Sequence, residues 1–185
     1  GLEGVLAGRA DGVKGITNGI DVAAWNPEND PYLSAQYTAA DLSGKQACKQ
    51  ALQRELGLPN RDVPLLAGIG RLTFQKGFDL LIDVIPELMF LDAQIVVLGT
   101  GDRHLEQQLT AIKARYPNRI GLCLGFDERL AHRIEAGADM LIMPSRYEPC
   151  GLSQLYSLRY GTVPIVRRTG GLADTVVPFR PSTIN

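Results

Sequence analysis

The run Pro64-Leu65-Leu66-Ala67-Gly68-Ile69-Gly70 is apolar, is bounded by turn residues, and is followed by apolar residues at helical spacing from Leu80 to Leu88. Such a run predicts a buried strand, and the spacing after it predicts a helix. The cycle recurs along the chain: further strands are expected at 94–98, 120–124, 140–143 and 163–166, and further helices at 105–116, 128–136, 152–160 and 172–177. Strands that are apolar throughout are covered on both sides, so the sequence predicts an α/β fold, a Rossmann-like parallel sheet with helices on both faces.

The segment up to about residue 44 has a different composition, rich in Gly, Asn, Asp and Pro, and we interpret it as a connecting segment. Trp25 is expected to pack where this segment meets the sheet. From Lys45 onward, Ala47, Ala51, Leu52 and Leu56 recur at helical spacing, and Gly57 with Pro59 supplies a helix stop. These residues predict a helix of about twelve residues.

The composition narrows the class of function. The 185 residues are 45% hydrophobic, with 19 basic against 20 acidic side chains, which is typical of a globular protein and gives no field to gather nucleic acid or an anionic membrane. No apolar run approaches the ~20 residues that span a bilayer, and no signal segment opens the chain. Three widely spaced cysteines fit neither a disulfide framework nor a paired zinc site, which indicates a reducing compartment. We expect a cytoplasmic protein with a small-molecule partner and, since the chain starts at Gly1 without Met, a piece of a longer protein.

The loop after the first strand reads Gly70-Arg71-Leu72-Thr73-Phe74-Gln75-Lys76-Gly77-Phe78. In open parallel sheets, ligands bind outside the carboxyl ends of the strands, where this loop lies. The Arg71 guanidinium offers a planar fork for two phosphate oxygens, Lys76 adds a mobile charge, and the helix start that follows favours an anion. Together they suit a diphosphate; the alternative is a solvated pair of surface charges.

The loop after the 140–143 strand reads Pro144-Ser145-Arg146-Tyr147-Glu148-Pro149-Cys150-Gly151-Leu152-Ser153-Gln154. Glu148 can accept hydrogen bonds from ligand hydroxyls, and the N–H groups of Cys150, Gly151 and Leu152 can hold an oxyanion. A sugar phosphate satisfies both, whereas a carboxylate that only caps the next helix needs no ligand. No histidine partner for Cys150 is identifiable, so we interpret Cys150 as a small buried residue rather than a nucleophile.

Two further loops carry weaker signals. Residues 167–171, Arg-Arg-Thr-Gly-Gly before an expected helix, favour an anion, although a glycine-rich loop can simply let the chain turn. Gly99 and Gly101 form a lone G-x-G, and the third glycine of the dinucleotide fingerprint would fall at His104. A nicotinamide dehydrogenase is therefore disfavoured.

One aromatic residue and the two histidines of the chain remain to be interpreted. Phe126 follows the 120–124 strand directly, where it can stack on a base or serve as an ordinary rim aromatic. His104 and His132 lie on separate expected helices without the spacing of a metal or catalytic motif, so we interpret both as surface or structural residues.

Three strings taken together resemble one family: residues 70–77, 144–156 and 166–175, with Asn18-Gly19-Ile20-Asp21 near the start. They are similar to the signature loops of bacterial glycogen synthases and plant starch synthases, and the resemblance runs from residue 18 to Val177. It implies the GT-B architecture, in which two Rossmann-like domains face a cleft, and transfer of glucose from ADP-glucose to the non-reducing 4-hydroxyl end of an α-1,4-glucan with retention. It assigns residues 1–19 to the tail of the N-terminal acceptor domain and the interdomain crossing, and residues 20–185 to the C-terminal donor-nucleotide-binding domain, truncated at its C-terminal end.

The resemblance also implies a role for each candidate. Arg71 and Lys76 would bind the diphosphate and stabilise the departing ADP, Glu148 would hold hydroxyls of the donor glucose, and Phe126 would lie against adenine. Donor contacts are further expected from Gly99, Gly101, Cys150, Gly151, Leu152, Thr169, Gly170 and Gly171. Two cations and the helix N-termini stabilise the charge that develops on the β-phosphate, so neither metal nor cofactor is expected. Related retaining enzymes carry a second Glu eight residues after the first, and that position is Tyr156 here.

The glucan would bind mainly through the absent N-terminal domain, so the chain alone is expected to bind ADP weakly and to be inactive. The alternative is a non-catalytic nucleotide-binding Rossmann module. Arg71, Lys76 and Glu148 together favour the transferase, because a simple nucleotide binder has no use for a sugar-directed carboxylate. The residues alone leave open ADP against UDP and glycogen against starch. The location implied is the cytoplasm, or a plastid if the source is a plant.

Overall fold

The computed structural model describes residues 2–9 and 12–181. Five strands form one sheet in the order β3-β2-β1-β4-β5, and every neighbouring pair is parallel. The strands are β1 (Leu65–Ile69), β2 (Gln94–Gly99), β3 (Ile120–Leu124), β4 (Met140–Met143) and β5 (Val163–Val166). The helices are α1 (Glu3–Ala7), α2 (Ser43–Glu55), α3 (Phe78–Leu88), α4 (Arg103–Arg115), α5 (Glu128–Gly137), α6 (Ser153–Arg159) and α7 (Gly170–Thr175). The α/β fold predicted from the apolar runs is confirmed.

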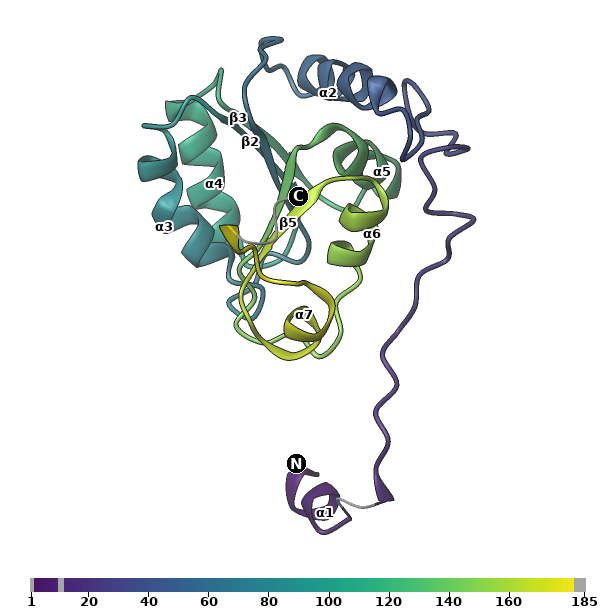
Figure 1. The fold of residues 1–185 in the computed structure, drawn as a ribbon. Coiled ribbons are helices and arrows are strands. Elements are labelled where there is room, and N and C mark those ends of the chain that lie inside the picture. The colour runs from purple at the N-terminus through teal and green to yellow at the C-terminus, as the bar shows by residue number, and fades with distance from the viewer. Residues whose placement is uncertain (1, 10–11, 182–185) are drawn as a thin grey trace.

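Helices cover both faces of the sheet, with α3 and α4 on one side and α5 and α6 on the other (Figure 1). The inner strand β2 is buried along its whole length, as its apolar sequence predicts. One core joins α3 and α4 to the sheet: Leu81, Ile85, Ile95, Val97 and Leu109. The other joins α2 and α5 to the opposite face: Leu52, Ala67, Val96, Leu98 and Ile134. Each fully buried aliphatic side chain stabilises the fold by about 1.5–3 kcal/mol relative to exposure.

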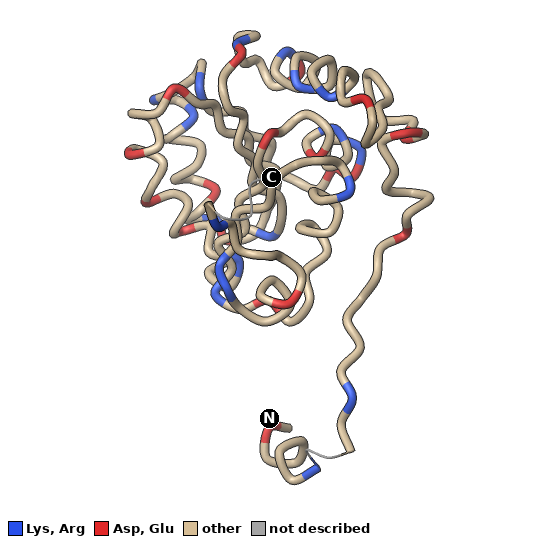
Figure 2. Tube along the Cα trace, in the orientation of Figure 1, with Lys and Arg blue, Asp and Glu red and all other residues tan. Residues whose placement is uncertain are grey.

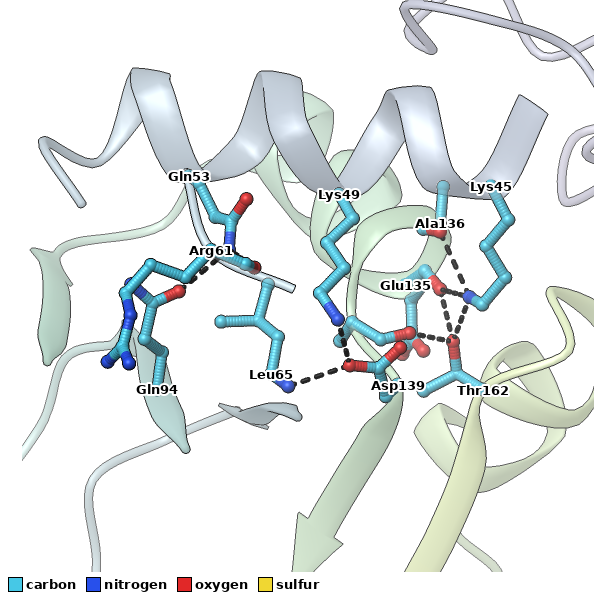
Figure 3. Close-up of polar contacts among 11 residues, drawn as sticks. Lys45, Lys49, Gln53, Arg61, Leu65, Gln94, Glu135, Ala136, Asp139 and Thr162 are labelled. Carbon is cyan, nitrogen blue, oxygen red and sulfur yellow. Dashed lines mark hydrogen bonds and ion pairs between the residues drawn. The ribbon is translucent and has the colours of Figure 1, made fainter. Parts of the chain in front are cut away.

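The face of α2 that turns inward is partly polar. Lys45, Lys49 and Gln53 lie one turn apart on this helix and reach toward the amino ends of the strands (Figure 3). Lys49 Nζ donates to Asp139 Oδ2 at 2.7 Å, and the same oxygen accepts from the backbone N–H of Leu65. The helical spacing of Ala47, Ala51, Leu52 and Leu56 predicted the helix correctly. It did not indicate the buried face, because Ala47 is exposed whereas Lys49 and Gln53 are buried.

The connecting segment contacts helices rather than the sheet. The Trp25 ring stacks between His132 of α5 and Tyr156 of α6, with ring centroids 3.7 Å apart in both cases. The prediction that Trp25 meets the sheet is therefore wrong. Buried His132 bonds to the buried carboxylate of Asp30 at 2.7 Å, which confirms its structural role. Tyr156, which occupies the position where related retaining enzymes carry a second Glu, therefore contacts the connecting segment.

The surface charges fit the near-neutral composition. Figure 2 shows both signs spread over the fold, with neither gathered into one face. Within residues 2–9 and 12–181, no helix is both long and apolar enough to cross a membrane.

Candidate functional site

The strand order places the two chemically richest loops side by side. β1 pairs with β2 on one side and with β4 on the other, so the order of the strands reverses between β1 and β4. The crevice outside the carboxyl ends of two such strands is where open α/β sheets bind ligands. The loops that follow β1 and β4 carry Lys76 and Glu148.

Lys76 and Glu148 are in direct contact although 72 positions separate them. Lys76 Nζ forms an ion pair with Glu148 Oε2, and Ser145 Oγ lies 3.4 Å from the same oxygen. Glu148 is only 7% exposed, while Lys76 is half-buried beside a cavity of about 60 Å³ that Ser145 also lines. Two of the three charged residues expected to act on the donor, Lys76 and Glu148, therefore form one ion pair beside a cavity.

Arg71 lies in a second, larger cavity. The cavity has a volume of about 210 Å³ and is formed at the ends of β1, β2 and β3, with Gly99 and Phe126 in its lining. It is smaller than the roughly 300–1,000 Å³ of a complete ligand site, so it fits one part of a ligand. The Phe126 side chain is 89% exposed. Gly70 lines both cavities, so the two cavities are neighbours.

Glycines allow the loops to approach one another closely. Gly77 caps α3 with φ +72°, and a Cβ there would overlap the Pro144 carbonyl oxygen. A Cβ at Gly170 would overlap the Glu148 carbonyl oxygen, and the Gly171 N–H donates to that oxygen at 2.9 Å. The 169–171 turn thus supports the backbone that carries Glu148.

The fourth loop is held in the same way. A Cβ at Gly99 would overlap the Gly70 carbonyl oxygen, and one at Gly101 would overlap that of Leu72. Gly99 also lines the larger cavity, whereas Gly101 is not among its lining residues. Their donor contacts, like those of Thr169, Gly170 and Gly171, stay predictions.

The loop at Cys150, Gly151 and Leu152 precedes α6, which begins at Ser153. Gln154 Nε2 donates to the carbonyl oxygens of Cys150 and Gly151 at 3.0 and 3.1 Å. Cys150 is half-buried, so the prediction of a buried residue is wrong there. Gln154 was part of the quoted motif but received no role from the sequence. Besides these two carbonyl oxygens, its Nε2 donates to Thr175 Oγ1 of α7 at 3.2 Å.

Arg146 is a second residue whose role the sequence analysis missed. Its guanidinium donates to both carboxylate oxygens of Asp79 at 2.7 and 2.6 Å and stacks over the Phe74 ring at 3.4 Å from the centroid. The hydrogen bonds from Arg146 lower the pKa of the Asp79 carboxyl below its ordinary value and raise that of the guanidinium. The pair links the first turn of α3 to the Glu148 loop, and only the strand order could have indicated it.

Among the described residues, no group of three or more His, Cys, Asp or Glu side chains is arranged so that it could hold a metal ion. His104 is exposed, with its backbone N–H on the Asp102 carboxylate at the start of α4. This arrangement fits the surface role predicted for it.

Comparison with known proteins adds the family. The pattern of the family described as glycosyl transferases group 1 matches residues 49–182. The chain belongs to this family. Among curated relatives of this group 1 glycosyl transferase, the glycogen synthase of Anaeromyxobacter sp. (strain Fw109-5) is 58% identical over 180 residues, covering 97% of this chain and 38% of the relative. The chain therefore spans well under half the length of the curated relatives that it matches.

Solved structures agree with the sequence matches. The catalytic domain of Starch Synthase IV from Arabidopsis thaliana, bound to ADP and acarbose, superposes with a TM-score of 0.91 at 40% identity, covering 100% of this chain and 38% of that one. The C-terminal domain of a group 1 glycosyl transferase from Francisella tularensis gives 0.60 at 19% identity, covering 86% of this chain and 76% of that one, which bears on the fold alone. The resemblance to glycogen and starch synthases and the GT-B C-terminal fold, both predicted from the loops, are confirmed.

Proposed function

We propose that this group 1 glycosyl transferase is the donor-binding part of a glycogen or starch synthase, which transfers glucose from ADP-glucose to the non-reducing 4-hydroxyl end of an α-1,4-glucan with retention. The observation that carries the proposal is the contact between Lys76 and Glu148 at the switch between β1 and β4. Relatives named glycogen synthase over nearly the whole chain support it.

The charges suit the chemistry of this transfer. Breaking the bond between glucose and ADP loads negative charge onto the β-phosphate, and cations fixed in advance stabilise that charge without reorganising. Lys76 and Arg71 supply the cations. Glu148 accepts hydrogen bonds from hydroxyls of the glucose and does not act as a nucleophile in this proposal.

The two cavities suggest how the donor lies. The base occupies the cavity beside Phe126, the diphosphate crosses Gly70 between Arg71 and Lys76, and the glucose reaches Glu148. The starch synthase IV structure carries ADP and acarbose, which supports an adenine nucleotide and a glucan as partners. The reaction needs no cofactor and no metal in this proposal.

The wider organisation follows the same family. Residues 1–19 belong to the end of an acceptor domain and the crossing from it, and residues 20–185 to the donor domain. The acceptor domain supplies most glucan contacts. The location is the cytoplasm, or a plastid in a plant.

Calorimetric titration of the chain with ADP, ADP-glucose and UDP-glucose, without divalent metal, tests the donor site. We expect saturable binding of ADP and ADP-glucose that is lost in Arg71→Ala/Lys76→Ala. The matched control, Lys113→Ala/Arg115→Ala, removes the same charges from the last turn of α4 and keeps binding. Binding that survives in the Arg71 and Lys76 variant would refute the assignment.

Transfer itself is tested in a graft that carries this chain in place of the matching 180 residues of the Anaeromyxobacter glycogen synthase. We expect the graft to elongate a glucan from ADP-glucose and the isolated chain not to do so. ADP binding by the chain with an inactive graft would favour the non-catalytic nucleotide-binding module, and turnover by the isolated chain would refute its need for an acceptor domain.

A further inference from the structure

Arg146 connects the loops around the donor site without being free to bind the donor itself. Its Nη1 donates to Asp79 Oδ1 and to the Phe74 carbonyl oxygen, both at 2.7 Å, and its Nη2 donates to Asp79 Oδ2. Arg71, by contrast, is exposed and lines the larger cavity. Arg146 therefore differs from Arg71 in kind, because its fork is already matched to a protein carboxylate.

The backbone of Arg146 adds two further links. Its N–H donates to the Gln75 carbonyl oxygen at 2.8 Å, and Gln75 directly precedes Lys76. Its carbonyl oxygen lies 3.5 Å from Thr169 Oγ1 in the turn that supports Glu148 from behind. Arg146, in the loop that follows β4, thus contacts the loops that follow β1 and β5.

We propose that Arg146 is a positioning residue for glucosyl transfer, which holds Lys76 against Glu148 by fixing the 73–79 segment to the 144–148 loop. The inference rests on the proposed function. Lys76 follows the Gln75 carbonyl by one residue, and Glu148 follows Arg146 by two, so a shift of either loop separates the charges that act on the donor. A lysine cannot replace Arg146, because an ammonium lacks the planar fork that grips both oxygens of Asp79.

The chain provides a matched control. Arg133 of α5 donates from Nε and Nη2 to the two carboxylate oxygens of Glu55 at 2.8 and 2.7 Å, so it also forms a bidentate pair. Neither Arg133 nor Glu55 lines the two cavities beside Arg71 and Lys76. Arg133→Lys makes the identical chemical change at a pair that touches no donor-site loop.

The first experiment measures acetylation of Lys76 by N-hydroxysuccinimidyl acetate, followed by mass spectrometry, on the 185-residue chain. In Arg146→Lys we expect Lys76 to react about tenfold faster, as for the loss of one charge-assisted hydrogen bond, with Lys113 unchanged. Asp79→Asn should act in the same direction, and Arg133→Lys should leave Lys76 as in the wild type. An unchanged rate at Lys76, or an equal rise at Lys113, would overturn the inference.

The second experiment compares kinetics in the graft. Arg146→Lys should lower kcat about 10–100-fold with KM for ADP-glucose little changed, the pattern of a misplaced transition-state contact. A loss no greater than that of Arg133→Lys overturns the inference, as does a change confined to KM. A wild-type graft without transfer would count against the proposed function, while the acetylation of Lys76 would still decide the role of Arg146.

Discussion

Two lysine–carboxylate pairs lie at opposite ends of the sheet. At the carboxyl ends of the strands, Lys76 meets Glu148 beside a cavity. At the amino ends, Lys49 of α2 meets Asp139, with the Lys49 side chain only 6% exposed. Both pairs join segments that are distant in sequence, so the chemistry of the groups alone does not separate a site from a structural contact.

The difference lies in what surrounds each pair. Asp139 Oδ2 also accepts the Leu65 N–H at the start of β1, so this carboxylate is part of the fold (Figure 3). Glu148 and Lys76 are carried by loops, and Lys76 borders a cavity that part of a ligand can enter. An ion pair whose carboxylate also accepts a backbone hydrogen bond stabilises the fold. An ion pair beside a cavity can instead exchange one partner for a ligand.

The largest expected effect comes from breaking the ion pair between Lys76 and Glu148. In the graft, Lys76→Met should lower kcat about 10²–10³-fold, because a preorganised donor to the developing phosphate charge is lost. Because Glu148 is buried and loses its ammonium partner, the midpoint of thermal unfolding should fall as well. Lys113→Met on the last turn of α4 should leave kcat at the wild-type value, and an equal loss in both variants would show that charge alone matters.

Breaking the other pair should change stability and leave binding intact. Lys49→Met leaves Asp139 without its ammonium partner, and we expect the free energy of unfolding in urea to fall by about 2–3 kcal/mol. The value lies below that of a fully buried broken pair because the Asp139 side chain is 37% exposed. The ADP affinity of the folded variant should match the wild type, and a weaker affinity would contradict the separation of the two ends.

The same contrast explains what the sequence could predict. Apolar runs bounded by turn residues predicted the bounds of β3, β4 and β5 correctly, although β5 at the edge of the sheet is only partly buried. The last helix was expected at 172–177 but α7 spans Gly170–Thr175, because its start is set by glycines that pack on the 148–150 backbone rather than by apolar spacing. Local patterns thus determine elements, and tertiary contacts determine where some of them begin.

The site itself was predictable only in part. Motifs indicated Arg71, Lys76 and Glu148, and the strand-end rule indicated the edge of the sheet. The contact of Lys76 with Glu148, and the pairing of Arg146 with Asp79, depend on β1 lying next to β4, which no local pattern specifies. The inward lysines of α2 were missed for a related reason, since their partners are helix ends and strand starts far along the chain.

A smaller effect is expected from the buried carboxyl near the amino ends of the strands. Glu135 is fully buried, its Oε2 has no hydrogen-bond partner among the described residues, and burial raises its pKa well above 4.5 against the attraction of Lys45. The folded state therefore binds more protons than the unfolded one above pH 4.5, so stability falls as pH rises toward the folded pKa. Glu135→Gln should flatten this slope in urea unfolding measured across a pH series. A slope that persists in the variant would assign it to other groups.

The smallest expected effect lies on the alkaline side, at Lys45. Its Nζ bonds to Thr162 Oγ1 at 2.7 Å and to the carbonyl oxygens of Ala136 and Tyr160 at 2.9 and 3.2 Å, at the ends of α5 and α6. Burial lowers its pKa to about 8, although Asp139, Glu135 and Cys48 favour the charged form. Between about pH 8 and the unfolded value of 10.5, the unfolded chain binds more protons, so this group makes stability rise with pH by at most about 1.4 kcal/mol per pH unit. Lys45→Met should remove that rise in the same urea series, while Lys76→Met, at the donor end, should leave it in place. A rise that disappears in both variants would show that the two ends of the sheet titrate together and are not independent.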